Sequence, residues 1–126
     1  MKLNMDCVRD VLLTVEDQPF NKLLRMSELT EILPNYSEDE LTYTCDKLQE
    51  GGLLDVLIAR ADLLPPAVKG IRDLTFEGHE FLDQIRPPER WDEVKNITRR
   101  IGTVSLKMLS TVSEAIITAA LKNYFS

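Results

Sequence analysis

The sequence predicts a mainly helical fold: a winged helix-turn-helix domain with a small β-wing, followed by a two-helix C-terminal extension. Apolar residues recur at the 3.6-residue spacing of a helix over most of the chain. One short stretch, residues 53–60, is instead rich in branched apolar side chains, which is typical of a strand. Pro87-Pro88 then separates a predicted winged-helix domain at residues 1–86 from an extension at residues 87–126.

Two amphipathic helices are expected before the helix that leads into the wing. The first begins after Asn4, a good N-cap residue, and ends near Asp17, with Pro19 just beyond it. The second is short, because Ser27 is expected to cap it and Pro34 forces the chain out of helical geometry after about two turns.

The third helix has the clearest start in the chain. Ser37 is expected at the N-cap of a capping box, with Glu40 at the third helical position. The helix runs from about Glu38 to Glu50. Gly51-Gly52 ends it, because the left-handed conformation after a helix favours glycine.

A two-stranded wing is expected to follow the third helix. The strand at residues 53–60 pairs with a short returning strand at residues 71–74, since the two prolines within residues 64–70 remove ladder donors. Thr75 then caps a fourth helix, which Pro87-Pro88 ends.

The extension consists of a helix that breaks at Gly102 and a last helix from Thr103 to about Tyr124. Apolar residues, starting at Val104, cover more than half the circumference of the last helix, so it either braces the domain or pairs with a second copy. We expect a homodimer and no membrane contact. The candidate dimer interface consists of Met108, Val112, Ala115, Ile116, Ala119 and Ala120.

Three segments carry a family resemblance. Residues 43–54 resemble the end of a winged-helix third helix running into the first wing strand, and residues 71–82 resemble the L-T-x-x-G-H-x-F-L return of many bacterial regulators. The start MKLNMDCVRD, this return, and the downstream Trp91 and Lys95 together resemble a family of small uncharacterised proteins of bacterial genomes, prophages and mobile elements. The resemblance implies a winged-helix fold and a small regulatory or interaction protein, and it carries no assigned chemistry.

The charge balance excludes a uniformly basic binder of nucleic acid or anionic membrane. The chain has 15 Lys and Arg against 21 Asp and Glu, a net charge of −6. The outward face of the third helix is predicted to carry Asp39, Tyr43, Asp46 and Glu50. We interpret this acidic face as a surface for a partner protein, including one that it engages by imitating DNA; a merely solvated face is the plainer alternative.

The rival hypothesis is a DNA-binding transcriptional regulator that uses the wing and the basic penultimate helix. Its candidate nucleic-acid contacts are Arg60, Lys69, Arg72, Arg90, Lys95, Arg99 and Arg100. Ordinary scattered surface charge explains the same cations. Reversing Arg99 and Arg100 is expected to weaken a DNA binder and to leave a protein binder unaffected.

No motif points to an enzyme, a metal or a cofactor. The chain lacks a Gly-rich phosphate loop, an H-E-x-x-H motif and a G-x-S-x-G motif. Its single histidine, His79, belongs to no motif that would bring a nucleophile or further metal ligands to it. Cys7 and Cys45 lie in helical patterns without a C-x-x-C, so we expect two structural thiols and a reducing cytoplasm. The predicted protein is therefore non-enzymatic, without cofactor or metal, and cytoplasmic.

Overall fold

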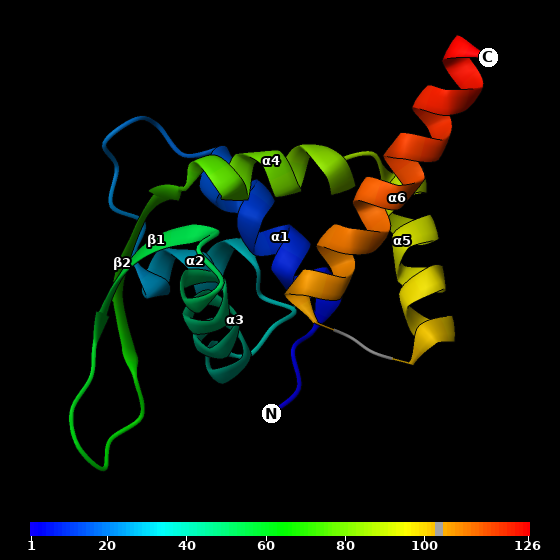
Figure 1. The fold of residues 1–126 in the computed structure, drawn as a ribbon. Helices are drawn as coiled ribbons and strands as arrows, with labels where there is room; N and C mark the ends of the chain where they lie inside the picture. The colour runs from blue at the N-terminus through cyan, green and yellow to red at the C-terminus, as the bar shows by residue number, and fades with distance from the viewer. Residues whose placement is uncertain (103–104) are drawn as a thin grey trace. The chain divides into compact units, whose positions relative to one another are not determined.

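The computed structural model describes residues 1–102 and 105–126, and Figure 1 shows helices and one two-stranded antiparallel sheet in this part of the chain. This confirms the predicted mainly helical fold with a small β-wing and C-terminal helices. The predicted start of the last helix at Thr103 and the contribution of Val104 to its apolar face lie outside the described residues. In order, the elements are α1 (Met5–Glu16), α2 (Met26–Ile32), α3 (Glu38–Glu50), β1 (Leu54–Ala59), β2 (Ala67–Leu74), α4 (Phe76–Ile85), α5 (Pro88–Ile101) and α6 (Leu106–Phe125).

The chain divides into two compact units, Met1–His79 and Glu80–Ser126. We call them the N-terminal unit and the C-terminal unit. The division falls inside α4, earlier than the boundary expected at residues 86 and 87.

Side-chain caps set the starts of α1 and α3, as predicted. The Asn4 Oδ1 atom accepts hydrogen bonds from the backbone N–H groups of Asp6 and Cys7, at 3.0 and 3.2 Å. The Ser37 Oγ atom accepts one from the Glu40 backbone at 3.1 Å. The Glu40 carboxylate in turn accepts a 2.8 Å hydrogen bond from the Asn4 amide, which ties the two helix starts together.

The start of α2 differs from the prediction. The N-cap residue is Arg25, not Ser27. The backbone N–H of Arg25 donates a 3.1 Å hydrogen bond to the Glu28 carboxylate. The reason is non-local: Leu24 and Ile71 exchange two backbone hydrogen bonds, of 2.9 and 2.7 Å, in an isolated bridge. This bridge fixes the chain as extended up to Leu24, so the helix begins directly after it.

The wing is a β1–β2 hairpin whose second strand is longer than predicted. β2 begins at Ala67, immediately after the two prolines, and Ala67 pairs with Ala59 while Gly70 pairs with Leu57. The prolines therefore precede the ladder rather than interrupt it. Gly70 allows a close approach, because a Cβ atom there would lie 2.5 Å from the Leu23 side chain.

The core of the N-terminal unit lies between α1, α2, α3 and the sheet. The inward stripe of α3 is the predicted one, with Leu41, Cys45 and Leu48 all fully buried. They belong to one apolar cluster with residues of α1, α2 and the sheet: Val8, Val11, Leu12, Leu29, Leu54 and Ile71.

The C-terminal unit contains the helical hairpin of α5 and α6, which run in opposite directions along each other (Figure 1). Gly102 ends α5 in the left-handed conformation, with a φ of +84°, as predicted from the glycine. Ser105 caps α6 by accepting a 3.1 Å hydrogen bond from the Met108 backbone. Val94 and Thr98 of α5 are buried, as are Leu109 and Val112 of α6.

Candidate partner-binding surface

The outer face of α3 keeps most of its predicted acidic character. Asp39 and Glu50 are exposed and Tyr43 is half-buried. Lys47 lies with its Nζ atom 5.5 Å from the centre of the Tyr43 ring and 3.0 Å from the Glu50 carboxylate. The hydrogen bond to Glu50 raises the pKa of Lys47, so this cation is already matched by a carboxylate of its own helix.

Asp46 is the exception, and its predicted exposure is wrong. The residue is only 7% exposed, and its carboxylate accepts a hydrogen bond from the Arg60 guanidinium in an ion pair. Arg60 directly follows β1, where the strand leads into the turn of the hairpin, so the wing covers a position of α3 that helical periodicity assigned to solvent. One predicted partner contact and one predicted DNA contact therefore neutralise each other.

The tip of the wing, residues 61–66, is apolar apart from Asp62 and contains no Lys or Arg. Leu63 is fully exposed and has a φ of +65°, which is rare for a residue with a branched side chain. Leu64 is also exposed, and its backbone N–H donates a 3.2 Å hydrogen bond to the Ala61 carbonyl. The sequence analysis did not predict this exposed apolar tip, although two leucines beside two prolines in the connection between the strands could have indicated it.

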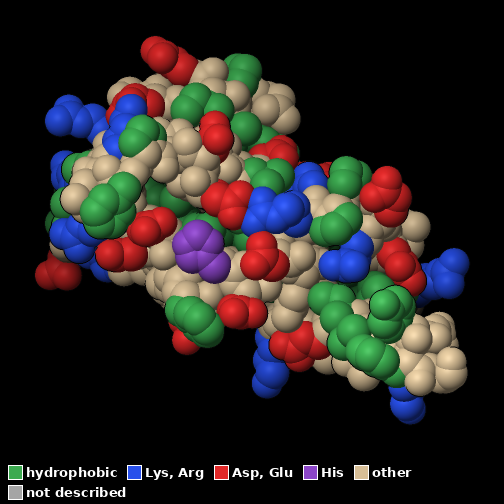
Figure 2. Space-filling model, turned by 90° about the horizontal axis from the view of Figure 1, so that it is seen from above, with side chains coloured by type: hydrophobic (Ala, Val, Ile, Leu, Met, Phe, Trp, Pro, Cys, Tyr) green, Lys and Arg blue, Asp and Glu red, His purple; other side chains and the backbone are tan. Residues whose placement is uncertain are grey.

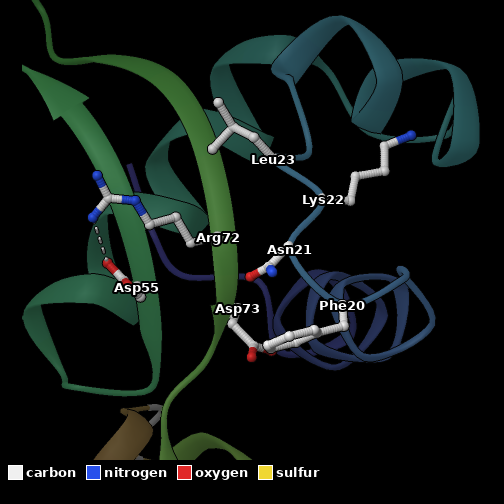
Figure 3. Close-up of a pocket in the computed structure, with 7 residues that line it drawn as sticks. All are labelled: Phe20, Asn21, Lys22, Leu23, Asp55, Arg72 and Asp73. Atoms are coloured by element: carbon white, nitrogen blue, oxygen red, sulfur yellow. Dashed lines mark ion pairs between the residues drawn. The ribbon is translucent and has the colours of Figure 1, made fainter.

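A shallow cavity of about 480 Å³ lies beside the base of the wing. Figure 3 shows the loop between α1 and α2 on one side, and Arg72 reaching from β2 toward Asp55 on β1. The Arg72 and Asp55 side chains lie 3.7 Å apart, and each is more than half exposed. The lining is of mixed charge: Phe20, Asn21, Lys22, Leu23, Asp55, Arg72 and Asp73.

The remaining predicted DNA contacts are divided between the two units. Lys69 is exposed on β2, in the N-terminal unit. On α5, Arg99 and Arg100 are exposed in the last turn, where cations are favoured by the helix dipole. Arg90 is half-buried, and Lys95 is mostly covered, with its Nζ atom 5.7 Å from the centre of the Trp91 ring.

An apolar groove of about 450 Å³ runs between α5 and α6 in the C-terminal unit. Ala120 is exposed and, unlike the other five residues of the predicted dimer interface, does not line this groove. The lining consists of Glu93, Ile97, Ile101, Met108, Thr111, Val112, Ala115, Ile116 and Ala119.

The two thiols have the environment of structural cysteines. Cys7 and Cys45 are fully buried and unpaired as a disulfide. Burial raises the pKa of Cys7 to about 11, although its Sγ atom accepts a 3.3 Å hydrogen bond from Thr44. Burial raises the pKa of Cys45 to about 12. Thiols with these pKa values are poor nucleophiles at neutral pH.

Histidine and carboxylates do not assemble into a metal site in the described residues. No group of three His, Cys, Asp or Glu side chains there lies close enough to hold a metal ion. His79 is exposed, and Figure 2 draws the single histidine at the surface among carboxylate side chains. No helix in the described ranges combines the length and the apolar character that crossing a membrane requires.

These features define a small helical domain with a two-stranded wing and a C-terminal helical hairpin. The model of a family of hypothetical proteins, DUF2513, matches residues 2–105, and the chain belongs to this family. An uncharacterised protein of Haemophilus influenzae (strain ATCC 51907 / DSM 11121 / KW20 / Rd) is 30% identical to it over 122 residues, which cover 96% of this chain and 99% of the relative. No solved structure matches the chain. The predicted membership in a family of small uncharacterised proteins is confirmed.

Proposed function

We propose that the chain is a non-enzymatic, cytoplasmic winged-helix protein of the prophage or mobile-element type that binds a partner protein. The contact surface is the outer face of α3 together with the tip of the wing. The element order supports the winged-helix assignment, as does the backbone bridge between Leu24 and Ile71, which adds a third extended segment beside the hairpin.

One observation carries the choice of a protein partner over DNA: the cations of this surface are matched by carboxylates or missing. Arg60 pairs with Asp46, and Lys47 pairs with Glu50. The wing tip, residues 61–66, offers no cation at all. A winged helix that reads DNA gains affinity by releasing counterions from phosphates, and this surface has few charges with which to do so.

The same surface offers the chemistry of a protein interface. Leu63 and Leu64 project from a tip that Pro65-Pro66 stiffens, and the Arg60–Asp46 pair holds the wing against α3 next to this tip. A preorganised apolar anchor loses little conformational entropy on binding. The complementary partner has an apolar pocket for the two leucines and a basic rim for Asp39 and Glu50.

Titration into generic duplex DNA at low and at physiological salt tests the choice of partner class. We expect no binding at low salt, where nonspecific electrostatic contact is strongest. Micromolar binding that weakens with salt, and that is lost when Arg99 and Arg100 are both changed to Glu, would replace the proposal with the DNA-binding regulator.

A photo-crosslinking side chain at Leu64 tests the surface itself in the host cytoplasm. We expect a discrete ultraviolet-dependent adduct that is absent when the crosslinker stands at the exposed Glu31 of α2. Tyr43→Ala in the same chain should reduce the adduct, and reversal of Arg99 and Arg100 should not. Identical adducts from both positions would contradict the proposed surface. Competition by duplex DNA would show that the acidic face imitates DNA.

A further inference from the structure

We propose that α6 pairs antiparallel with the α6 of a second copy of this chain, across the groove that it forms with α5. This inference concerns the C-terminal unit alone and is independent of the partner-binding surface. It defines a second interaction surface, which binds a second copy of the chain.

The groove presents a self-complementary stripe. Met108, Val112, Ala115 and Ala119 follow each other at spacings of three and four residues, so they lie on one face of α6. Lys122 continues this face by one more turn. The face thus has an apolar stretch with small side chains at Ala115 and Ala119, where another helix can approach closely, and it ends in a cation.

The second half of α6 is largely exposed. Beyond Ser113, none of its residues is buried. α6 has 20 residues and α5 has 14, so α6 extends about 9 Å further at 1.5 Å per residue. A helix that continues this far past its neighbour, with exposed apolar residues such as Leu121 and Phe125, is typical of one that packs against another chain.

Charge complementarity selects a second copy as the occupant. Glu93 is the only charged residue that lines the groove, and neither it nor Lys122 has an ion-pair partner in the described part of the chain. Because α5 and α6 run in opposite directions (Figure 1), Glu93 lies toward the Ala119 end of the groove and Ile101 toward the Met108 end.

A two-fold axis that passes between Ala115 and Ala119 gives both charged groups, Glu93 and Lys122, a partner in the other copy. It places the partner subunit's Ala119 against Ala115, so that the smallest side chains meet where the helices cross. The partner subunit's Lys122 then lies along the groove, within reach of Glu93. The two-fold symmetry repeats this ion pair on the other side, as an isologous interface requires.

The mass in solution of the full chain across a dilution series provides the first test. We expect a dimer that dissociates on dilution, and we expect Ala119→Arg to give a folded monomer. Glu93→Lys and Lys122→Glu should each weaken the dimer about tenfold, and the combined reversal should restore it. Glu114→Lys is the matched control, because Glu114 is exposed on α6 outside the groove face and its reversal should change nothing.

Disulfide trapping tests the antiparallel register. A chain with Ala115→Cys mixed with a chain with Ala119→Cys should crosslink faster than either chain alone. The buried Cys7 and Cys45 do not compete in this experiment. A wild-type monomer at all concentrations, a dimer that survives Ala119→Arg, or a double reversal that fails to restore association would each overturn the proposal.

Discussion

The two units of this chain use the polar groups in and beside their cores in different ways. In the N-terminal unit, these groups join elements that are far apart in sequence: Tyr36 donates a 2.6 Å hydrogen bond to Asp10, and Thr44 donates one of 3.3 Å to Cys7. In the C-terminal unit, the buried hydroxyls of Thr98 and Ser113 donate to carbonyls four residues earlier in their own helices.

This difference bears on how strictly each unit is specified. A polar group bonded across elements is satisfied in only one arrangement of those elements, so it favours a unique packing. A hydroxyl bonded within its own helix is satisfied wherever that helix lies. The N-terminal unit is therefore fixed by its own side chains, whereas the α5–α6 hairpin has mainly apolar packing and an open groove that a further helix can occupy.

The largest expected effect is a cavity in the N-terminal core. Leu48→Ala removes a fully buried side chain from α3, so we expect it to lower the free energy of unfolding by about 2–5 kcal/mol. Urea denaturation measures this loss. Leu121→Ala, at a half-exposed position of α6, should cost less than about 0.5 kcal/mol. Equal losses for the two variants would contradict the closed packing around Leu48 in the N-terminal unit.

The next effect concerns the Arg60–Asp46 ion pair, which lies next to the tip of the wing. Arg60→Ala leaves the buried Asp46 carboxylate without its guanidinium partner, so we expect a loss of about 1–3 kcal/mol of unfolding free energy. Arg72→Ala breaks a pair whose side chains are both more than half exposed, and its expected cost is below about 1 kcal/mol. Similar costs for both variants would show that the wing is not held against α3 by Arg60.

The features that were predicted correctly depend on neighbours in the sequence. Asn4, Ser37 and Thr75 accept hydrogen bonds from backbone groups two or three residues later, and Gly102 ends its own helix. Cap residues and glycine therefore indicate where a helix starts or ends, whatever the tertiary structure.

The features that were missed depend on distant contacts. Asp46 is buried because Arg60 folds back from the wing, and α2 starts early because Leu24 bridges to Ile71. A helical wheel contains neither contact. For the candidate surface, the acidic character of α3 was therefore predictable, whereas the loss of Asp46 from it and the exposure of Leu63 required the fold.

Alkaline pH should destabilise the N-terminal unit more than its exposed groups would suggest. Burial raises the pKa of Cys7 to about 11 and that of Cys45 to about 12, and both burial and the hydrogen bond to Asp10 raise the pKa of Tyr36. Above about pH 9 the unfolded chain loses the thiol protons while the folded chain keeps them, so stability falls by up to about 1.4 kcal/mol per pH unit for each such group.

Denaturation between pH 8 and pH 10.5 measures how steeply the free energy of unfolding falls with pH. Cys45→Ala should make this fall shallower by about the contribution of one thiol. The stability that these groups contribute is fully present below their unfolded pKa and is lost as the pH rises toward the folded values. A slope that is the same in wild type and Cys45→Ala would contradict a buried, neutral thiol at that position.

The smallest expected effect is at the open groove of the C-terminal unit. Ile101 is 53% exposed, so Ile101→Ser should change the free energy of unfolding by less than about 0.5 kcal/mol when the protein is dilute enough to be monomeric. Val94→Ala, on the buried face of the same helix, is the matched comparison and should cost about 1–3 kcal/mol. At concentrations where a dimer forms, Ile101→Ser should lower the free energy of unfolding by more. The groove is then covered, so the substitution also removes an apolar contact with the second copy. An effect of Ile101→Ser that is equally small at every concentration would mean that no second copy covers this end of the groove.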